Sequence, residues 1–233
     1  MSKDRMPRIP EGCRDFGNTY FEKRRQYAEK LIETFVAKVA PPMCLDESDG
    51  IWTQSIRRRF FEICPEDCYP LPDAPWNAKG EFLADVTWAE IAKEKRLLLS
   101  CEIEWGTGWH ANTNWSLVAE HFEKLFPVKA PFKVFIFSSD EPLDRTKGTV
   151  EGDFLIELAR EKLEASLGNY GHHLAGEVYI FIDFPRTHKP KTSGIYRSFI
   201  WLAKEYGKQN VKLKKCPGCK LVRPSKHDVI GAW

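Results

Sequence analysis

Three acidic residues on two neighbouring segments could support metal-dependent chemistry. The stretch LLLSCEIEWG (97–106) carries Glu102 and Glu104 at a spacing of two, and Asp85 lies in the preceding stretch EFLADVTWAEI (81–91). On a β-strand, a spacing of two puts both glutamates on one face. Because neighbouring carboxylates repel, we expect a divalent cation with oxygen ligands, such as Mg²⁺ or Mn²⁺, to hold the three acids together.

A cation at this position would suit the hydrolysis of a phosphodiester. A metal-bound water is a better nucleophile than free water, and the same ion stabilises charge on a phosphoryl oxygen. The alternative is that the acids form the solvent-facing side of a half-exposed hairpin, where polar and apolar residues commonly alternate. The apolar residues ahead of Glu102 favour a central strand, and therefore the metal site.

The elements that must position these acids follow from the spacing of apolar residues. Segments 81–91 and 97–105, with a polar turn at 93–95, predict a β-hairpin, whereas 194–206 is compatible with either helix or strand. Helical spacing recurs in four segments, roughly 20–39, 51–63, 114–126 and 149–167. Apolar runs typical of buried strands cover 132–139 and 177–184. The sequence predicts an α/β fold with the acidic strand near the centre of its sheet.

This arrangement resembles the PD-(D/E)XK nuclease superfamily, which has the restriction-endonuclease-like fold. The core of that family is a helix, three strands, a helix and a further strand, forming a central mixed β-sheet flanked by helices. Its motif is a lone acid on one strand and (D/E)-x-K on the next. Asp85 matches the lone acid and Glu102 the first residue of the second motif. Glu104 stands where the family usually has lysine, and some restriction enzymes of this fold are similar in carrying Glu-x-Glu.

The resemblance, which covers roughly residues 51–139, implies a Mg²⁺- or Mn²⁺-dependent endonuclease that hydrolyses DNA. Asp85 and Glu102 would ligate the metal together with the backbone carbonyl of Ile103. A homodimer is an expected partner, because cutting both strands of a duplex commonly uses two copies of an enzyme.

The roles of three further residues stay open. Glu104 would bind a second metal or orient the attacking water, and Lys124, on the following helix, would replace the missing motif lysine. Lys124 could instead be a surface residue paired with Glu120. Glu62, on the preceding helix, is either an additional metal neighbour or a plain surface acid. His121 is interpreted as a core or surface histidine rather than a catalytic one.

Contacts with nucleic acid would have to come from local clusters, because the formal net charge of the chain is only +2. The candidates are Arg57, Arg58, Arg59, Trp109, Lys189 and Lys191. The alternatives are a solvated arginine run, an aromatic side chain that covers the core, and an ordinary basic surface loop.

The chain has seven cysteines, lacks an N-terminal signal pattern, and contains no run approaching 18 apolar residues. We expect a cytoplasmic protein with free thiols and no membrane partner. The competing possibility is a structural Zn²⁺ bound by four thiolates, those of Cys64, Cys68, Cys216 and Cys219.

Along the chain we expect an N-terminal arm and helix (1–50), a nuclease-like α/β core (51–206) and a basic tail with a CxxC motif (207–233). Two other functions compete with the endonuclease. One is a non-catalytic module that binds nucleic acid or another subunit on a degenerate nuclease fold. The other is an enzyme that acts on small phosphorylated molecules.

Overall fold

The structure, a computed structural model, describes eleven segments of the 233-residue chain. They are residues 5–17, 19–39, 49–71, 84–91, 96–105, 115–137, 152–183, 197–203, 214–215, 220–222 and 229–232.

Two α-helices and three strands come first, then a helix, a strand, a helix and the remaining strands. The helices are η1 (Glu11–Cys13, a 3-10 helix), α1 (Phe21–Val39), α2 (Asp49–Ile63), α3 (Trp115–Glu123) and α4 (Gly152–Asn169). The strands are β1 (Cys68–Leu71), β2 (Val86–Glu90), β3 (Leu97–Glu104), β4 (Phe132–Phe137), β5 (Val178–Asp183), β6 (Arg197–Leu202), β7 (Lys214–Lys215), β8 (Lys220–Val222) and β9 (Val229–Ala232). In the described part of the chain, every helix is too short or too polar to cross a membrane.

The main sheet has seven strands in the order β1-β2-β3-β4-β5-β6-β7. Strands β3, β4 and β5 run parallel, and the other neighbouring pairs are antiparallel. The predicted α/β class, with a mixed sheet flanked by helices, is confirmed. The hairpin is also confirmed, with Val86 opposite Cys101, and the ambiguous segment 194–206 contributes strand β6.

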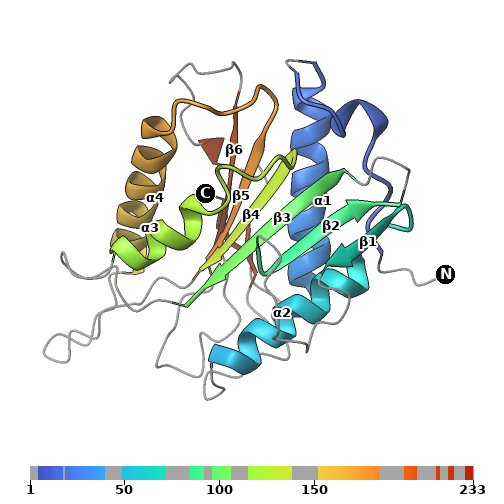
Figure 1. The fold of residues 1–233 in the computed structure, drawn as a ribbon. Helices are drawn as coiled ribbons and strands as arrows, with labels where there is room; N and C mark the ends of the chain where they lie inside the picture. The colour runs from blue at the N-terminus through green and yellow to red at the C-terminus, as the bar shows by residue number, and fades with distance from the viewer. Residues whose placement is uncertain are drawn as a thin grey trace, which may run out of the picture.

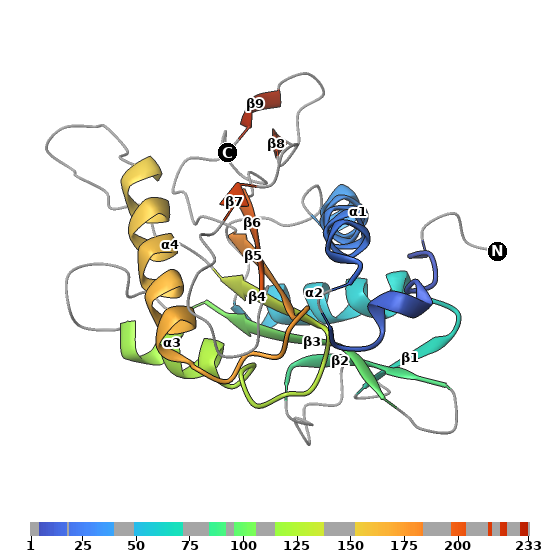
Figure 2. The ribbon, with the colours of Figure 1, turned by 90° about the horizontal axis from the view of Figure 1, so that it is seen from above.

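The helices cover the sheet in two layers, α1 and α2 on one face and α3 and α4 on the other (Figures 1 and 2). Side chains of the buried strands point alternately to the two faces of the sheet, so each strand contributes to the core under both helix layers. Val134 and Ile136 of β4 belong to the core under α1 and α2, whereas Phe135 and Phe137 belong to the core under α3 and α4. A strand buried on both faces in this way reads as a continuous apolar run, as β4 does in the sequence.

The N-terminal segment 5–17 is packed against the rest of the protein. Met6, Ile9 and Cys13 are buried in the core under α1 and α2. The buried guanidinium of Arg24 donates hydrogen bonds to carbonyl oxygens on both sides, one at Asp15 in this segment and one at Gly176 in the turn before β5. A charged side chain can be buried in this way because backbone carbonyls accept hydrogen bonds from both of its terminal nitrogens.

Candidate functional site

The candidate site begins with the two glutamates of β3. Glu102 is paired with Phe135 of β4 and Glu104 with Phe137, so both face the layer of α3 and α4. Cys101 and Ile103 lie in the opposite core. The strand alternation therefore puts both carboxylates on one face, as the sequence predicts.

His121, on α3, lies between the two carboxylates. Its Nε2 is 3.1 Å from Oε2 of Glu104, and its Nδ1 is 3.7 Å from Oε2 of Glu102. Lys124, one helical turn further along, places its Nζ 3.2 Å from the same Nδ1. We call these four residues the Glu–His–Lys cluster. It brings the predicted residues Glu102, Glu104 and Lys124 together through a histidine.

These contacts favour one arrangement of protons. A lysine ammonium can only donate, so its hydrogen bond to Nδ1 leaves the imidazole proton on Nε2, directed at Glu104. The cluster also runs from the interior to the surface, because the exposed fraction of the side chain rises from 4% at Glu102 to 18% at Glu104 and 32% at His121. Glu102 is the inner acid, and His121 meets solvent.

Asp85 has different partners. One of its carboxylate oxygens accepts a hydrogen bond from the backbone N–H of Ile103 at 2.8 Å, and the other is paired with Arg57 of α2. Asp85 precedes the first residue of β2, so the alternation of the strand does not fix the direction of its side chain. Its hydrogen bond to the Ile103 N–H attaches Asp85 to the backbone of β3 between Glu102 and Glu104.

The acids have the oxygen ligands that a divalent cation needs, but their side chains are not grouped around one position. Carboxylate oxygens are the ligands that Mg²⁺ prefers. In the segments that the structure describes, however, no three His, Cys, Asp or Glu side chains are grouped to hold a metal ion. Side chains of the protein instead contact the acids, the Arg57 guanidinium at Asp85 and the His121 imidazole at the two glutamates. The carbonyl of Ile103 as a ligand stays a prediction.

The remaining candidates on α2 have separate surroundings. Glu62 contacts Arg58 at 3.5 Å and Arg59 at 3.2 Å. Arg59 is buried and donates a hydrogen bond to the Thr34 carbonyl of α1, so its role in the structure is to join the two helices. Among Arg57, Arg58 and Arg59, Arg58 is the exposed residue, with 74% of its side chain accessible to solvent.

Cys64 and Cys68, two of the four predicted zinc ligands, are buried free thiols. Burial and the charge of Asp67 raise the pKa of Cys68 to about 12, and burial raises the pKa of Cys64 as well. Both thiols therefore favour the protonated form, and a zinc ion would have to displace their protons to bind, so the four-thiolate site stays a prediction. The other candidates, Cys216, Cys219, Trp109, Lys189 and Lys191, lie outside the described residues.

A second polar cluster lies between β4, β5 and α4, and its groups bond to one another. Nζ of Lys133 donates to Glu177 at 2.7 Å and to the Tyr179 hydroxyl at 3.0 Å, and the other oxygen of Glu177 is 3.4 Å from Nδ1 of His173. Burial lowers the pKa of Lys133 and raises that of Tyr179. All four residues are buried, which identifies the cluster as part of the core.

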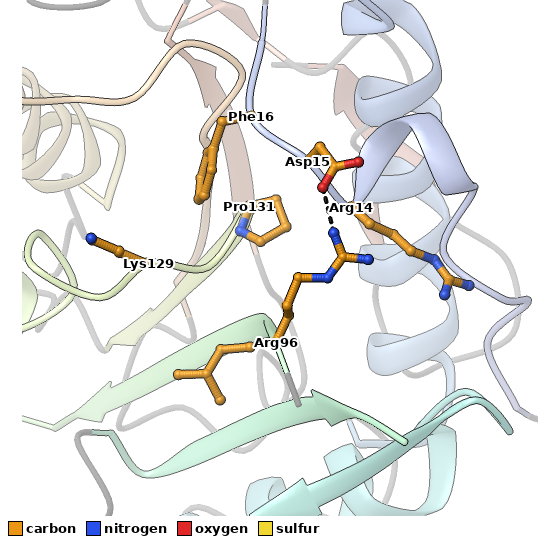
Figure 3. Close-up of a pocket in the computed structure, with 7 residues that line it drawn as sticks. Arg14, Asp15, Phe16, Arg96, Lys129 and Pro131 are labelled. Carbon is orange, nitrogen blue, oxygen red and sulfur yellow. Dashed lines mark hydrogen bonds and ion pairs between the residues drawn. The ribbon is translucent and has the colours of Figure 1, made fainter. Parts of the chain in front are cut away.

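One pocket of about 390 Å³ lies at the opposite end of β3 and β4 (Figure 3). Phe16, Leu97 and Pro131 line it, together with the cations Arg14, Arg96 and Lys129. The two arginines are already paired with acids, Arg14 with Asp67 and Glu90, and Arg96 with Glu90 and Asp15. This ion-pair network attaches the N-terminal segment to the hairpin.

Sequence reasoning missed His121 as a member of the site. The available signal was its spacing of three from Lys124 on the helix that follows the acids, which puts both side chains on one helix face. The chain matches no protein-family model, no curated protein and no solved structure. Its function must therefore be argued from the geometry of the site.

Proposed function

We propose that the protein is a nuclease of the restriction-endonuclease-like class that hydrolyses DNA phosphodiester bonds. The observation that carries the proposal is the Glu–His–Lys cluster on β3 and α3. It joins two carboxylates, an imidazole and an ammonium at the carboxyl end of a central parallel strand. Binding sites of open α/β sheets commonly lie at that end of the strands.

The order of the elements also supports this proposal. The chain runs α2, β1, β2, β3, α3, β4, which is the helix, three strands, helix and strand that the resemblance implies. Asp85 lies just before β2, and Glu102 and Glu104 lie on its neighbour β3, an arrangement that supports the proposed match to the motif. DNA is the substrate that we propose, and Arg58 on α2 is the exposed arginine available to its phosphates.

Each residue of the cluster has a defined part in the proposed reaction. Glu102 and Glu104 would hold a Mg²⁺ or Mn²⁺ ion, which when bound supplies an acidic water and charge stabilisation. The contact of His121 with Glu104 would fix the orientation of that carboxylate. The Lys124 ammonium stabilises the negative charge that develops on the phosphoryl oxygens in the transition state.

The test is cleavage of supercoiled plasmid with Mg²⁺ or Mn²⁺. The unmodified protein should nick the plasmid, and Glu102→Gln should lower the rate by about 10²-fold or more. Glu120→Gln, an exposed acid on the same helix as His121, is the matched control and should cleave normally. An unmodified protein without activity in either metal, or nicking that survives Glu102→Gln, would contradict the proposal.

A specific observation favours the non-catalytic alternative as a second candidate. The Arg57 guanidinium is already paired with Asp85, and the His121 imidazole already contacts both glutamates, so protein groups occupy the positions beside the acids where a metal ion would lie. If the protein binds DNA but cleaves it in neither metal, a nucleic-acid-binding module on this fold becomes the better assignment.

A further inference from the structure

The pocket shown in Figure 3 is a second candidate binding site, at the end of β3 and β4 away from the Glu–His–Lys cluster. Its apolar walls come from Phe16, Leu97 and Pro131. Its volume of about 390 Å³ lies within the range of small-molecule sites, about 300–1,000 Å³. The proposed nuclease reaction makes no use of this pocket.

Phe16 is an exposed aromatic residue whose backbone is held on both sides. Its relative exposure is 37%, although it lies next to a buried core. The carbonyl of the preceding Asp15 accepts a hydrogen bond from Arg24, and the N–H of the following Gly17 donates to the Ala175 carbonyl at 2.6 Å. The phenyl ring is therefore attached to a fixed backbone, and a ligand that packs against it loses little binding energy to ordering the protein.

The other apolar residues of the pocket are held by the main sheet. Leu97 is the first residue of β3, and Pro131 directly precedes β4. The carbonyl of Pro131 accepts a hydrogen bond from the N–H of Val178 on β5 at 2.9 Å. All three apolar walls are therefore already in place, as is usual for small-molecule sites.

The charges that line the pocket favour an anion. Three cations and one acid line it, and the acid, Asp15, is already paired with Arg96. Arg14 and Arg96 both have carboxylate partners, whereas the exposed Lys129 has no ion-pair partner among the described residues. In Figure 3, Lys129 and Arg96 lie on opposite sides of the Phe16 ring. The pocket thus combines an apolar space with one available positive charge at its edge.

We propose that this pocket binds a small aromatic carboxylate, with its ring against Phe16, Leu97 and Pro131 and its carboxylate on the Lys129 ammonium. Aromatic rings pack favourably against a phenyl ring in offset or edge-to-face geometry, and an ammonium donates charge-assisted hydrogen bonds to a carboxylate. A carboxylate carries one negative charge, which matches the one cation of the described lining that has no acid partner. This inference does not depend on the proposed nuclease activity.

The charge of the ligand is tested by isothermal titration calorimetry with 2-naphthoate and with 2-naphthamide, its uncharged analogue of the same shape. The unmodified protein should bind 2-naphthoate about threefold or more tightly than 2-naphthamide. Lys129→Gln should bind the two ligands equally. Lys30→Gln, which removes an exposed lysine of α1, is the matched control and should keep the preference for 2-naphthoate.

The apolar contact is tested by Phe16→Ala, which should weaken the binding of both ligands by about threefold or more. Ile51→Ala, which alters an exposed apolar residue of α2, is the matched control and should leave both affinities unchanged. Phe16→Leu serves as a second variant if Phe16→Ala lowers the melting temperature, because it removes the aromatic ring but keeps an apolar side chain.

Three results would overturn the proposed site. They are an unmodified protein without saturable binding of 2-naphthoate, a preference for 2-naphthoate that survives Lys129→Gln, and affinities that both Phe16 variants leave unchanged. Each is independent of plasmid cleavage, so this inference and the proposed nuclease function can fail separately.

Discussion

At the scale of single residues, the compensation of charge is the central feature of the site. Two carboxylates at a spacing of two on one strand face would repel each other if nothing positive lay between them. The His121 imidazole lies between them, 3.1 Å from Glu104 and 3.7 Å from Glu102, and the Lys124 ammonium, 3.2 Å from its Nδ1, supplies the positive charge of the cluster. From the sequence we predicted Glu102, Glu104 and Lys124 as site residues. We expected a metal ion, and not a histidine, to lie between the two glutamates.

Replacing His121 should separate catalysis from substrate binding. His121→Asn removes the imidazole between Glu104 and Lys124, so we expect kcat for plasmid nicking to fall by about 10²-fold while KM changes little. Steady-state kinetics on the plasmid measures both parameters. His172→Asn, which alters an exposed histidine beyond α4, should leave both unchanged. If KM instead rises by about as much as kcat was expected to fall, and kcat does not change, His121 would be assigned to DNA binding.

At the scale of elements, the hairpin of β2 and β3 is held from both ends. Just before β2 begins, the Asp85 carboxylate accepts a hydrogen bond from the backbone N–H of Ile103 on β3. Where β2 ends, Glu90 is paired with Arg14 at 2.5 Å and with Arg96 at 3.1 Å. Burial alone would raise the pKa of Glu90, but the hydrogen bonds from Arg96 and Arg14 outweigh it and lower the pKa below its ordinary value of 4.5.

That shift fixes the sign of a pH-dependent effect on stability. Because the pKa of Glu90 is lower in the folded state, its stabilising contribution is complete above 4.5 and is lost as the pH falls through the folded value. Glu90→Gln should therefore lower the free energy of unfolding by about 2 kcal/mol at neutral pH. The difference from the unmodified protein should shrink in strongly acidic buffer. Urea denaturation across pH checks this, with the exposed Glu66→Gln as control. A difference that does not vary with pH would contradict it.

At the scale of the whole molecule, the N-terminal segment is part of the core and not a free arm. Met6, Ile9 and Cys13 are 3%, 0% and 0% exposed. The N–H of Met6 donates to the Ile63 carbonyl at the end of α2, and Arg24 joins the segment to the turn before β5. The first residues therefore contact elements that come much later in the chain.

Deleting residues 1–17 should lower the stability of the entire fold. Each buried apolar side chain contributes about 1.5–3 kcal/mol, so losing Met6 and Ile9 together with the pairs of Arg14 should remove several kcal/mol. We expect a fall in melting temperature of about 10 °C or more, or the loss of a cooperative transition, by circular dichroism. Arg8→Ala, which changes an exposed residue of the same segment, is the control and should have little effect. An unchanged melting temperature after the long deletion would show that the segment contributes little.

Local patterns in the sequence determined much of the fold. The period of two in β3 placed Glu102 and Glu104 on one face, and helical spacing placed α1, α2, α3 and α4 close to their observed bounds. These features depend only on neighbouring residues, so the sequence alone specifies them. The α/β class followed from their order along the chain.

Contacts between distant residues were decided only by the tertiary structure. Asp85 lies just outside β2, so no alternation rule directs its side chain, and the packing of α2 gave it Arg57 as a partner. The position of His121 between the glutamates likewise depends on how α3 packs against β3, which a helical pattern does not specify. The sequence determined which charges the site contains. Packing decided which of them compensate one another, because that requires distances between elements and not spacing along the chain.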